Sequence, residues 1–414
     1  MPRYKDFFVT SFLKVATALG GLILSFVLLN KYGVEVVGQF SVILSLVYGV
    51  GIISSLGVEN VLIREVSKSE GLINVKPLIN SMCITIIISI ILSLVLTLVV
   101  DFFFDEYSFF SLGFALCITP LSLLWIGSGY MKGSGDAKLS GVFDINLSSL
   151  ITAVAVYFLP NEVENVGVFL GWVFLSSSII VLLLGAVIIY YTSMNKVYHN
   201  SDYNMYDYFL GCGTFCITSL TSYLQGNAIT LLSAMTLNNH QIGLLRFCTQ
   251  LSMLVSFPQI IFNIILPAHF SKFFNLGYIN KLESLARKTA TVSAVISIVV
   301  IFTILLGMYL FPSLMGNPES EFILYFVTLS IAQLINVSTG SVGYILNMTM
   351  NHKVVRNVSV IIGCVGLLMI IISPWSDHVW LYIFVLSFMT VSQNIILCYF
   401  LDKIVGIKSF VKVL

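Results

Sequence analysis

The sequence predicts an all-α polytopic membrane protein, with twelve transmembrane helices in two six-helix bundles around a central cavity. Of its 414 residues, 58% are hydrophobic and only 9% are charged, and the mean hydropathy is +0.99. A soluble domain usually carries about 25% charged residues, so too few polar side chains remain to cover a water-soluble globule. Twelve mostly apolar segments are each long enough to cross a bilayer, which takes about 20 residues.

The twelve predicted spans follow one another along the whole chain and are joined by short connections. Their approximate bounds are 8–30, 36–57, 77–100, 107–130, 140–159, 166–191, 207–236, 241–266, 287–311, 322–348, 354–374 and 379–401. The first apolar run is too long for the core of a signal peptide, so we expect a retained span. Helices satisfy every backbone hydrogen bond within lipid, and the ten-residue alternation of a membrane β-barrel is absent.

The basic residues predict the orientation of these spans. Of the twenty Lys and Arg residues, seventeen fall in every second gap between spans, and the alternate gaps are mostly acidic. Connections rich in Lys and Arg face the cytoplasm, so both termini are predicted to be cytoplasmic. Three basic residues break the pattern, namely Lys14, Lys31 and Arg246.

The spans divide into two halves of six, predicted to be an N-terminal lobe over 1–200 and a C-terminal lobe over 201–414. Similar Gly-led segments open the second span of each half, at Val37–Phe40 and Ile242–Leu245. Such a layout fits a parallel repeat about an axis along the membrane normal. The longest inner gaps, 58–76 and 267–286, are expected to be amphipathic pieces at the membrane surface or, alternatively, solvated loops.

Charged groups inside spans are the natural candidates for function, because they are costly to bury in a bilayer. Lys14 shares a helical face with small and polar residues that include Thr17, Gly21 and Ser25. That stripe favours a side chain facing a water-filled cavity, although a Lys at this depth could also reach back to the interface. Polar residues of span 7, including Gln225 and the following Asn227, indicate either a hydrophilic interior or hydrogen bonds between helices.

Arg246 lies near the outer end of span 8, and Thr249, Gln250 and Met253 share its helical face. It is either an interfacial anchor or a cationic site for a phosphate, which the planar guanidinium can bind with two hydrogen bonds.

Three further charged residues lie at the inner ends of spans. Asp144 opens span 5, where an acid stabilises a helix N-terminus; coupling to a proton or cation is the alternative. Glu59 and Arg64 close span 2, and we expect them to form an inner gate with an interfacial ion pair.

No enzymatic arrangement of residues is visible in the sequence. Paired acids, a Ser–His–Asp set and metal-ligand spacings are missing, and all seven Cys lie within apolar segments. We therefore expect no catalytic residues, cofactor or metal. The net charge of +1 gives no indication of nucleic-acid binding.

Short motifs carry a resemblance to a known family. The stretch Tyr32–Phe40 is similar to an "lG-x-x-x-fG-x-y" motif and Leu56–Glu65 to "lG-x-x-x-a-l-i-r". In the second half, Gln241–Leu244 and the pair Pro258 and Pro267 also resemble the family. Together with the layout of spans, they resemble the polysaccharide-transport family of the MATE-related (MOP) exporter superfamily, and most of all the O-antigen flippases called Wzx.

The resemblance implies a flippase that moves undecaprenyl-diphosphate-linked oligosaccharide (the O-antigen repeat unit) from the inner to the outer leaflet of the bacterial cytoplasmic (inner) membrane by alternating access. Its partners would be this lipid-linked substrate, the bilayer, and polysaccharide polymerase and chain-length proteins. Lys14 and Arg246, with Gln225, Asn227 and Gln250, would bind the substrate. Many relatives carry an acid where this chain has Asn227, which argues against proton coupling at that position.

Four rival functions remain open from the sequence. They are a multidrug or cation exporter of the same superfamily, a lipid II flippase, a membrane-embedded polymerase or glycosyltransferase, and a scaffold that does not transport. The shortage of acids in the spans argues against the first, and the short outer connections argue against the third.

Overall fold

The computed structural model describes residues 19–67, 76–103, 112–134, 136–159, 163–194 and 229–411 apart from 311–319, 350 and 374–377, with six single positions between 212 and 227. The chain forms two compact units. Unit 1 takes in Met1–Tyr32 and Gln39–Asn227, and unit 2 takes in Gly33–Gly38 and Ala228–Leu414. The predicted lobe boundary at 200/201 lies outside the described residues and stays a prediction.

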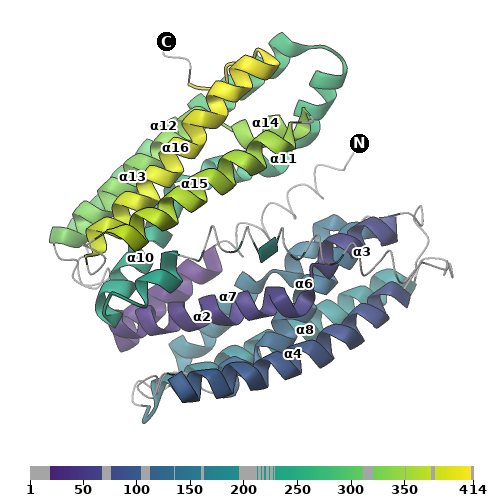
Figure 1. The fold of residues 1–414 in the computed structure, drawn as a ribbon, viewed down its shortest axis with the longest axis vertical. Coiled ribbons are helices and arrows are strands. Elements are labelled where there is room, and N and C mark those ends of the chain that lie inside the picture. The colour runs from purple at the N-terminus through teal and green to yellow at the C-terminus, as the bar shows by residue number, and fades with distance from the viewer. Residues whose placement is uncertain are drawn as a thin grey trace. The chain divides into compact units, whose positions relative to one another are not determined.

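Unit 1 is a bundle of helices (Figure 1). Its elements are Leu19–Tyr32, α2 (Val34–Ser55), α3 (Val58–Ser67), α4 (Lys76–Phe103), α5 (Leu112–Leu116), α6 (Ile118–Gly133), the 3-10 helix η1 (Ala137–Phe143), α7 (Ile145–Phe158) and α8 (Val166–Met194). Helix α6 is buried along most of its length and packs against α3, α4, α8 and η1. It therefore holds the other helices in place.

Unit 2 contains α10 (Asn239–Val255), α11 (Phe257–Asn275), α12 (Ile279–Leu310), α13 (Ser320–Thr339), α14 (Val342–Met348), α15 (His352–Ile372) and α16 (Val379–Val405). Helix α13 packs against α10, α12 and α16, and α15 packs against α16 (Figure 1). Two apolar segments are interrupted: α10 and α11 meet at a bend of 58°, and α13 gives way to α14 at Gly340.

Eight of the described helices are long and apolar enough to cross a membrane, or nine if the bent pair α10–α11 counts as one span. Two shorter apolar helices, Leu19–Tyr32 and Ile145–Phe158, fall at predicted spans. The chain is thus a multi-pass, all-α membrane protein, as predicted. The count of twelve spans is not confirmed over the described part of the chain.

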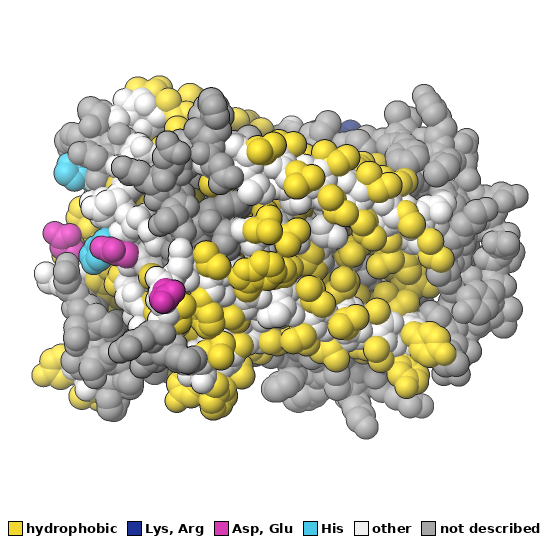
Figure 2. All heavy atoms as spheres, turned by 90° about the horizontal axis from the view of Figure 1, so that it is seen from below, with side chains coloured by type: hydrophobic (Ala, Val, Ile, Leu, Met, Phe, Trp, Pro, Cys, Tyr) yellow, Lys and Arg dark blue, Asp and Glu magenta, His cyan; other side chains and the backbone are white. Residues whose placement is uncertain are grey.

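The distribution of side chains on α4 explains why the helices associate in lipid. Its small polar residues face the protein, and the buried ones recur every four positions: Ser81, Thr85, Ser89 and Ser93. Its large apolar residues are exposed, among them Ile87, Ile91, Leu94 and Leu98. Small residues let helices approach closely where burial of apolar surface gives no driving force. Figure 2 shows one face of the molecule on which hydrophobic side chains predominate, with acidic and His side chains gathered near one edge.

The two inner gaps expected to be amphipathic pieces differ from each other. The first contains α3, a separate amphipathic helix, within its described residues. The second is not a separate piece, because α11 runs on to Asn275 and α12 begins at Ile279. Phe270 and Leu282 are fully buried in the core of unit 2, so this stretch is drawn into the bundle by its apolar residues.

Candidate functional site

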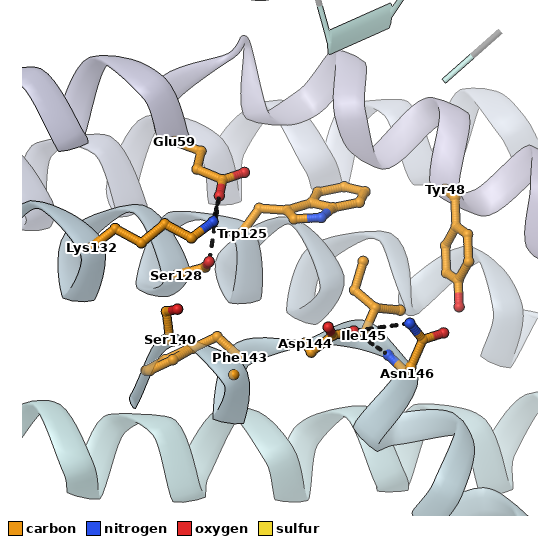
Figure 3. Close-up of a pocket in the computed structure, with 11 residues that line it drawn as sticks. Tyr48, Glu59, Trp125, Ser128, Lys132, Ser140, Phe143, Asp144, Ile145 and Asn146 are labelled. Carbon is orange, nitrogen blue, oxygen red and sulfur yellow. Dashed lines mark hydrogen bonds and ion pairs between the residues drawn. The ribbon is translucent and has the colours of Figure 1, made fainter. Parts of the chain in front are cut away.

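A polar pocket of about 370 Å³ lies within unit 1, where α2, α3, α6, η1 and α7 meet (Figure 3). Both Glu59 and Asp144, which the sequence singled out, lie at it. The lining residues are Tyr48, Glu59, Trp125, Ser128, Lys132, Ser140, Gly141, Phe143, Asp144, Ile145 and Asn146. The pocket thus combines two carboxylates, one amine, hydroxyls, an amide and aromatic rings in a protein otherwise poor in polar groups.

A sharp turn directs α3 across α6 and so forms one wall of the pocket. Leu56 and Gly57 both have positive φ, 50° and 70°. This left-handed conformation costs a residue other than glycine about 1–2 kcal/mol, so the surrounding packing must hold Leu56 in it. That packing comes from the apolar face of α3, whose residues Val58, Val61, Leu62 and Val66 are all buried. The burial of this face therefore positions Glu59.

Close contact between α3 and α6 depends on the absence of a side chain at Gly129. A Cβ placed there would lie 2.6 Å from the Glu59 carbonyl oxygen and 2.9 Å from its Cα. Gly133, one turn further on, meets Leu62, Ile63 and Val66 in the same way. This small-xxx-small spacing is typical of tightly packed membrane helices. It brings the Glu59 backbone directly over α6.

Glu59 forms an ion pair with Lys132 of α6. Lys132 Nζ lies 2.6 Å from Glu59 Oε1, and Ser128 Oγ lies 3.4 Å from the same oxygen (Figure 3). The side chain of Lys132 is 38% exposed and that of Glu59 is 26% exposed. Solvated pairs of this kind stabilise a fold by only about 0–1 kcal/mol. The pair can therefore open without unfolding the unit, and it joins α3 to α6 at the pocket.

Asp144 is the N-cap of α7. Its Oδ1 accepts hydrogen bonds from the backbone N and the Nδ2 of Asn146, each at 3.0 Å (Figure 3). Capping by Asp satisfies one of the free N–H groups at a helix start. The structure therefore shows Asp144 stabilising the start of α7, as one of the two interpretations expected. A role of Asp144 in ion coupling stays a prediction.

In unit 2, Arg246 and Gln250 lie one turn apart on α10 and therefore share one side of this helix. The same helix contains Phe247, Cys248 and Leu251. Those three are buried, and the Phe247 ring stacks on Phe322 of α13 with centroids 5.7 Å apart. The side chains of Arg246 and Gln250 are half-buried, and Gln250 Oε1 is enclosed without a hydrogen-bond partner among the described groups.

The other predicted site residues are less defined. Asn227 is half-buried, and its Nδ2 lies 3.4 Å from the carbonyl oxygen of Tyr223. Lys14 and Gln225 lie outside the described residues, and Arg64 belongs to α3 although its side chain is not described. The structure thus brings Glu59 and Asp144 to one pocket, and it places Arg246 and Gln250 together on one side of α10.

Sequence reasoning missed Lys132, Ser128 and Asn146 as pocket residues. In the sequence, Lys132 is one of the seventeen basic residues that predict the orientation of the spans. A usable signal was present, since Gly129 and Gly133 bracket it at the spacing expected for a close helix contact. Among the described residues, no group of three or more His, Cys, Asp or Glu side chains could hold a metal ion.

Comparison with protein families gives a match over most of the chain. A family model described as "Polysaccharide biosynthesis protein" matches residues 4–270. No curated protein sequence matches the chain.

Solved structures share the fold at low sequence identity. An inward-facing multidrug resistance MATE family transporter of the MOP superfamily is 11% identical, with a TM-score of 0.70 over 96% of this chain and 98% of its own. The lipid II flippase MurJ, in an inward closed conformation, is 13% identical, with a TM-score of 0.62 over 95% and 87%. A MOP superfamily transporter from Pyrococcus furiosus is also 13% identical, with a TM-score of 0.58 over 97% and 94%. The fold of this chain is therefore that of the MOP superfamily transporters.

Proposed function

The chain belongs to the family of polysaccharide biosynthesis proteins, and we propose that it is a flippase for undecaprenyl-diphosphate-linked oligosaccharide, the O-antigen repeat unit. It would carry this molecule from the inner to the outer leaflet of the bacterial cytoplasmic membrane by alternating access, the lobes 1–200 and 201–414 being its two moving parts. Both termini would be cytoplasmic.

One observation carries the proposal: the family match falls on a chain built of membrane-spanning helices with the fold of MOP superfamily transporters. A polysaccharide made from cytoplasmic precursors must cross the membrane. The sugar headgroup cannot enter hydrocarbon unaided, because each unpaired polar group costs several kcal/mol there. A protein of this family and fold suits that step.

In unit 1, we assign the inner gate to the pocket. Glu59 was expected to act with Arg64, and the partner that the pocket offers is Lys132, at 2.6 Å. A pair worth about 1 kcal/mol or less can break and re-form during each cycle. Hydroxyl, amide and aromatic groups beside it suit contact with a sugar. Arg64 stays in the proposal as a second cation of the gate.

For the diphosphate we propose cationic and amide groups from both halves. Arg246 and Gln250 would act from α10, where the enclosed Gln250 Oε1 could accept from a sugar hydroxyl. Lys14, Gln225 and Asn227 would act from the first half and span 7. Gly21 follows Lys14 by seven residues, which is about two helical turns, so we expect both residues on one face of the first helix. An added Cβ at Gly21 would lie 3.7 Å from Oδ1 of the pocket residue Asn146.

The proposal is tested by deleting the gene in its own host and restoring it with variants. Deletion should abolish surface polysaccharide while the lipid-linked repeat unit accumulates in the inner leaflet. Arg246→Ala and Lys14→Ala should fail to restore display, whereas Lys353→Ala, an exposed cation at the start of α15, should restore it. Normal display with both Arg246→Ala and Lys14→Ala would remove these residues from the site.

The same strain distinguishes the remaining functions. A multidrug exporter would leave polysaccharide display intact and alter sensitivity to cationic dyes. A lipid II flippase would be required for growth and would complement loss of the host's own lipid II flippase. Cross-linking in the membrane would show whether a polysaccharide polymerase or a chain-length protein lies beside the chain, and reporter fusions would locate the termini.

A further inference from the structure

A segment that follows α16, residues 406–411, runs extended against unit 2; we call it the strap. Helix α16 ends at Gly406, which has φ of 71°. Beyond it the side chains alternate between two environments, as expected for extended backbone. Ile407 and Ser409 are 0% and 1% exposed, whereas Lys408 and Phe410 project outward.

The strap is anchored at the break between α13 and α14, where the helical hydrogen-bond ladder is interrupted. The backbone N–H of Val411 donates to the Ser338 carbonyl at 3.0 Å, and the Ser409 hydroxyl donates to the Thr339 carbonyl at 2.7 Å. Buried carbonyl groups require partners in an apolar environment. The strap supplies two of them, so its backbone is fixed and the outward direction of Lys408 and Phe410 is fixed with it.

Arg287 of α12 joins the strap to the rest of this surface. Its Nε donates to the Lys408 carbonyl at 2.9 Å, its guanidinium carbon lies 5.6 Å from the centre of the Phe410 ring, and Glu283 Oε1 lies 2.7 Å from its Nη2. The charge of Arg287 is therefore neutralised within the protein. Other cations determine what this surface attracts.

Four exposed lysines surround this junction and form what we call the basic rim. They are Lys281 and Lys288 of α12, Lys403 of α16, and Lys408 of the strap. Leu282, Leu401 and Ile407 belong to one buried cluster, so the three segments that carry the lysines converge. In the described part of this surface the only acids are Glu283, which is paired, and Asp402.

Exposed apolar side chains alternate with these lysines. Leu276, Tyr278, Ile404 and Phe410 are each about half exposed. The ammonium groups of Lys281 and Lys403 lie 4.6 and 5.7 Å from the rings of Tyr278 and Tyr399. Cations beside exposed aromatic and aliphatic side chains are typical of the membrane–water interface, where rings sit among headgroups and lysines reach phosphates.

We propose that the basic rim binds the phosphate headgroups of anionic phospholipids, with Phe410 inserted beside them. The chemistry recognised is a phosphate that carries a net negative charge next to hydrocarbon. Because the strap holds Lys408 and also caps the break between α13 and α14, a bound headgroup stabilises the docked strap. The proposal concerns the lipid that surrounds the protein and is independent of the transported substrate.

The test uses purified full-length protein in a neutral detergent and measures its thermal unfolding midpoint. Dioleoylphosphatidylglycerol is the probe, with dioleoylphosphatidylcholine and inorganic phosphate as comparisons. Phosphatidylglycerol should raise the midpoint in a saturable way, because a ligand bound only to the folded state stabilises it. Lys288→Gln/Lys408→Gln should lower the apparent affinity roughly 30-fold, because each of the two basic residues contributes about 1 kcal/mol near an anionic surface.

A matched control removes the same number of charges from a different helix, α15, with Lys353→Gln/Arg356→Gln, whose side chains are both exposed. The control should keep the affinity of the wild type, and Lys288→Arg/Lys408→Arg should restore it. Equal weakening by the rim and control variants would overturn the proposal. Equal stabilisation by phosphatidylcholine, or by inorganic phosphate at the same phosphate concentration, would overturn it as well.

Discussion

Unit 1 and unit 2 each contain an interrupted apolar helix, and each fills the space beside the interruption differently. In unit 1, the turn at Leu56 and Gly57 leads into α3, and a polar pocket of about 370 Å³ remains below it. In unit 2, the break at Gly340 is filled by an apolar cluster and capped by the strap. Charged side chains line the pocket of unit 1. In unit 2 the lysines lie on the surface, outside an apolar core.

The difference follows from the polarity of the side chains at each place. The pocket in unit 1 is lined by charged and hydroxyl side chains, among them Glu59, Lys132 and Ser128. The strap in unit 2 instead inserts Ile407 among large apolar residues such as Phe270. A polar ligand can therefore enter the first region, and the second can only be approached from its surface. Four sets of substitutions test this contrast.

The largest effect is expected from Ile407→Ala, which removes most of a side chain that is fully buried in the cluster of unit 2. Truncation of a buried Ile to Ala costs about 2–5 kcal/mol, because a cavity remains. The unfolding midpoint in detergent should fall clearly. Ile404→Ala is the control, since Ile404 is 47% exposed. Equal losses from both variants would mean that the strap is not docked as described.

The next effect is expected from Gly129→Ala in unit 1. The added Cβ would lie 2.6 Å from the Glu59 carbonyl, and backbone cannot move as readily as a side chain. Overpacking of this kind costs about 1–3 kcal/mol. Gly343→Ala in α14 is the matched control, because its Cβ would meet nothing within 4 Å. That change should leave stability unchanged or raise it by up to about 1 kcal/mol through helix propensity.

A smaller effect is expected at Asp144, where two interpretations predict different results. Asp144→Ala should cost about 0.5–2 kcal/mol by removing the N-cap of α7. Asp144→Asn keeps an oxygen that can accept the Asn146 N–H and should preserve stability. If capping is the whole role, Asp144→Asn also preserves transport of the proposed substrate. Loss of transport with normal stability would instead indicate that the carboxylate takes part in ion coupling.

The sequence predicts the membrane class and the helical fold because both follow from the composition of single segments. Long apolar runs and alternating basic gaps are local features, and no knowledge of packing is needed to interpret them. The bend between α10 and α11 and the turn at Leu56 were not predicted. They depend on tertiary contacts, and Leu56 adopts positive φ although its side chain disfavours it.

The candidate site was predicted only in part, because some of its residues stand out locally and others meet only through tertiary contacts. Glu59 and Asp144 stand out as acids at the ends of apolar segments, and both line the pocket. The partner of Glu59 could not be read from spacing, because Lys132 lies 73 positions away and reaches it only after α3 has folded across α6. Arg64, five positions along the chain, was the natural guess from local proximity.

The smallest effect on stability is expected from the ion pair itself, and the size of the coupling energy separates the two possible partners of Glu59. In a double-mutant cycle, Glu59→Gln and Lys132→Gln should show a coupling of about 0.2–1 kcal/mol that weakens with added salt, as exposed pairs do. A cycle with Arg64→Gln should show less. The exchange Glu59→Lys/Lys132→Glu should restore polysaccharide display that either single reversal reduces, since a gate requires opposite charges and tolerates their order. A coupling to Arg64 that exceeds the coupling to Lys132, together with failure of the exchange, would assign the gate to Arg64 and leave Lys132 as a solvated neighbour.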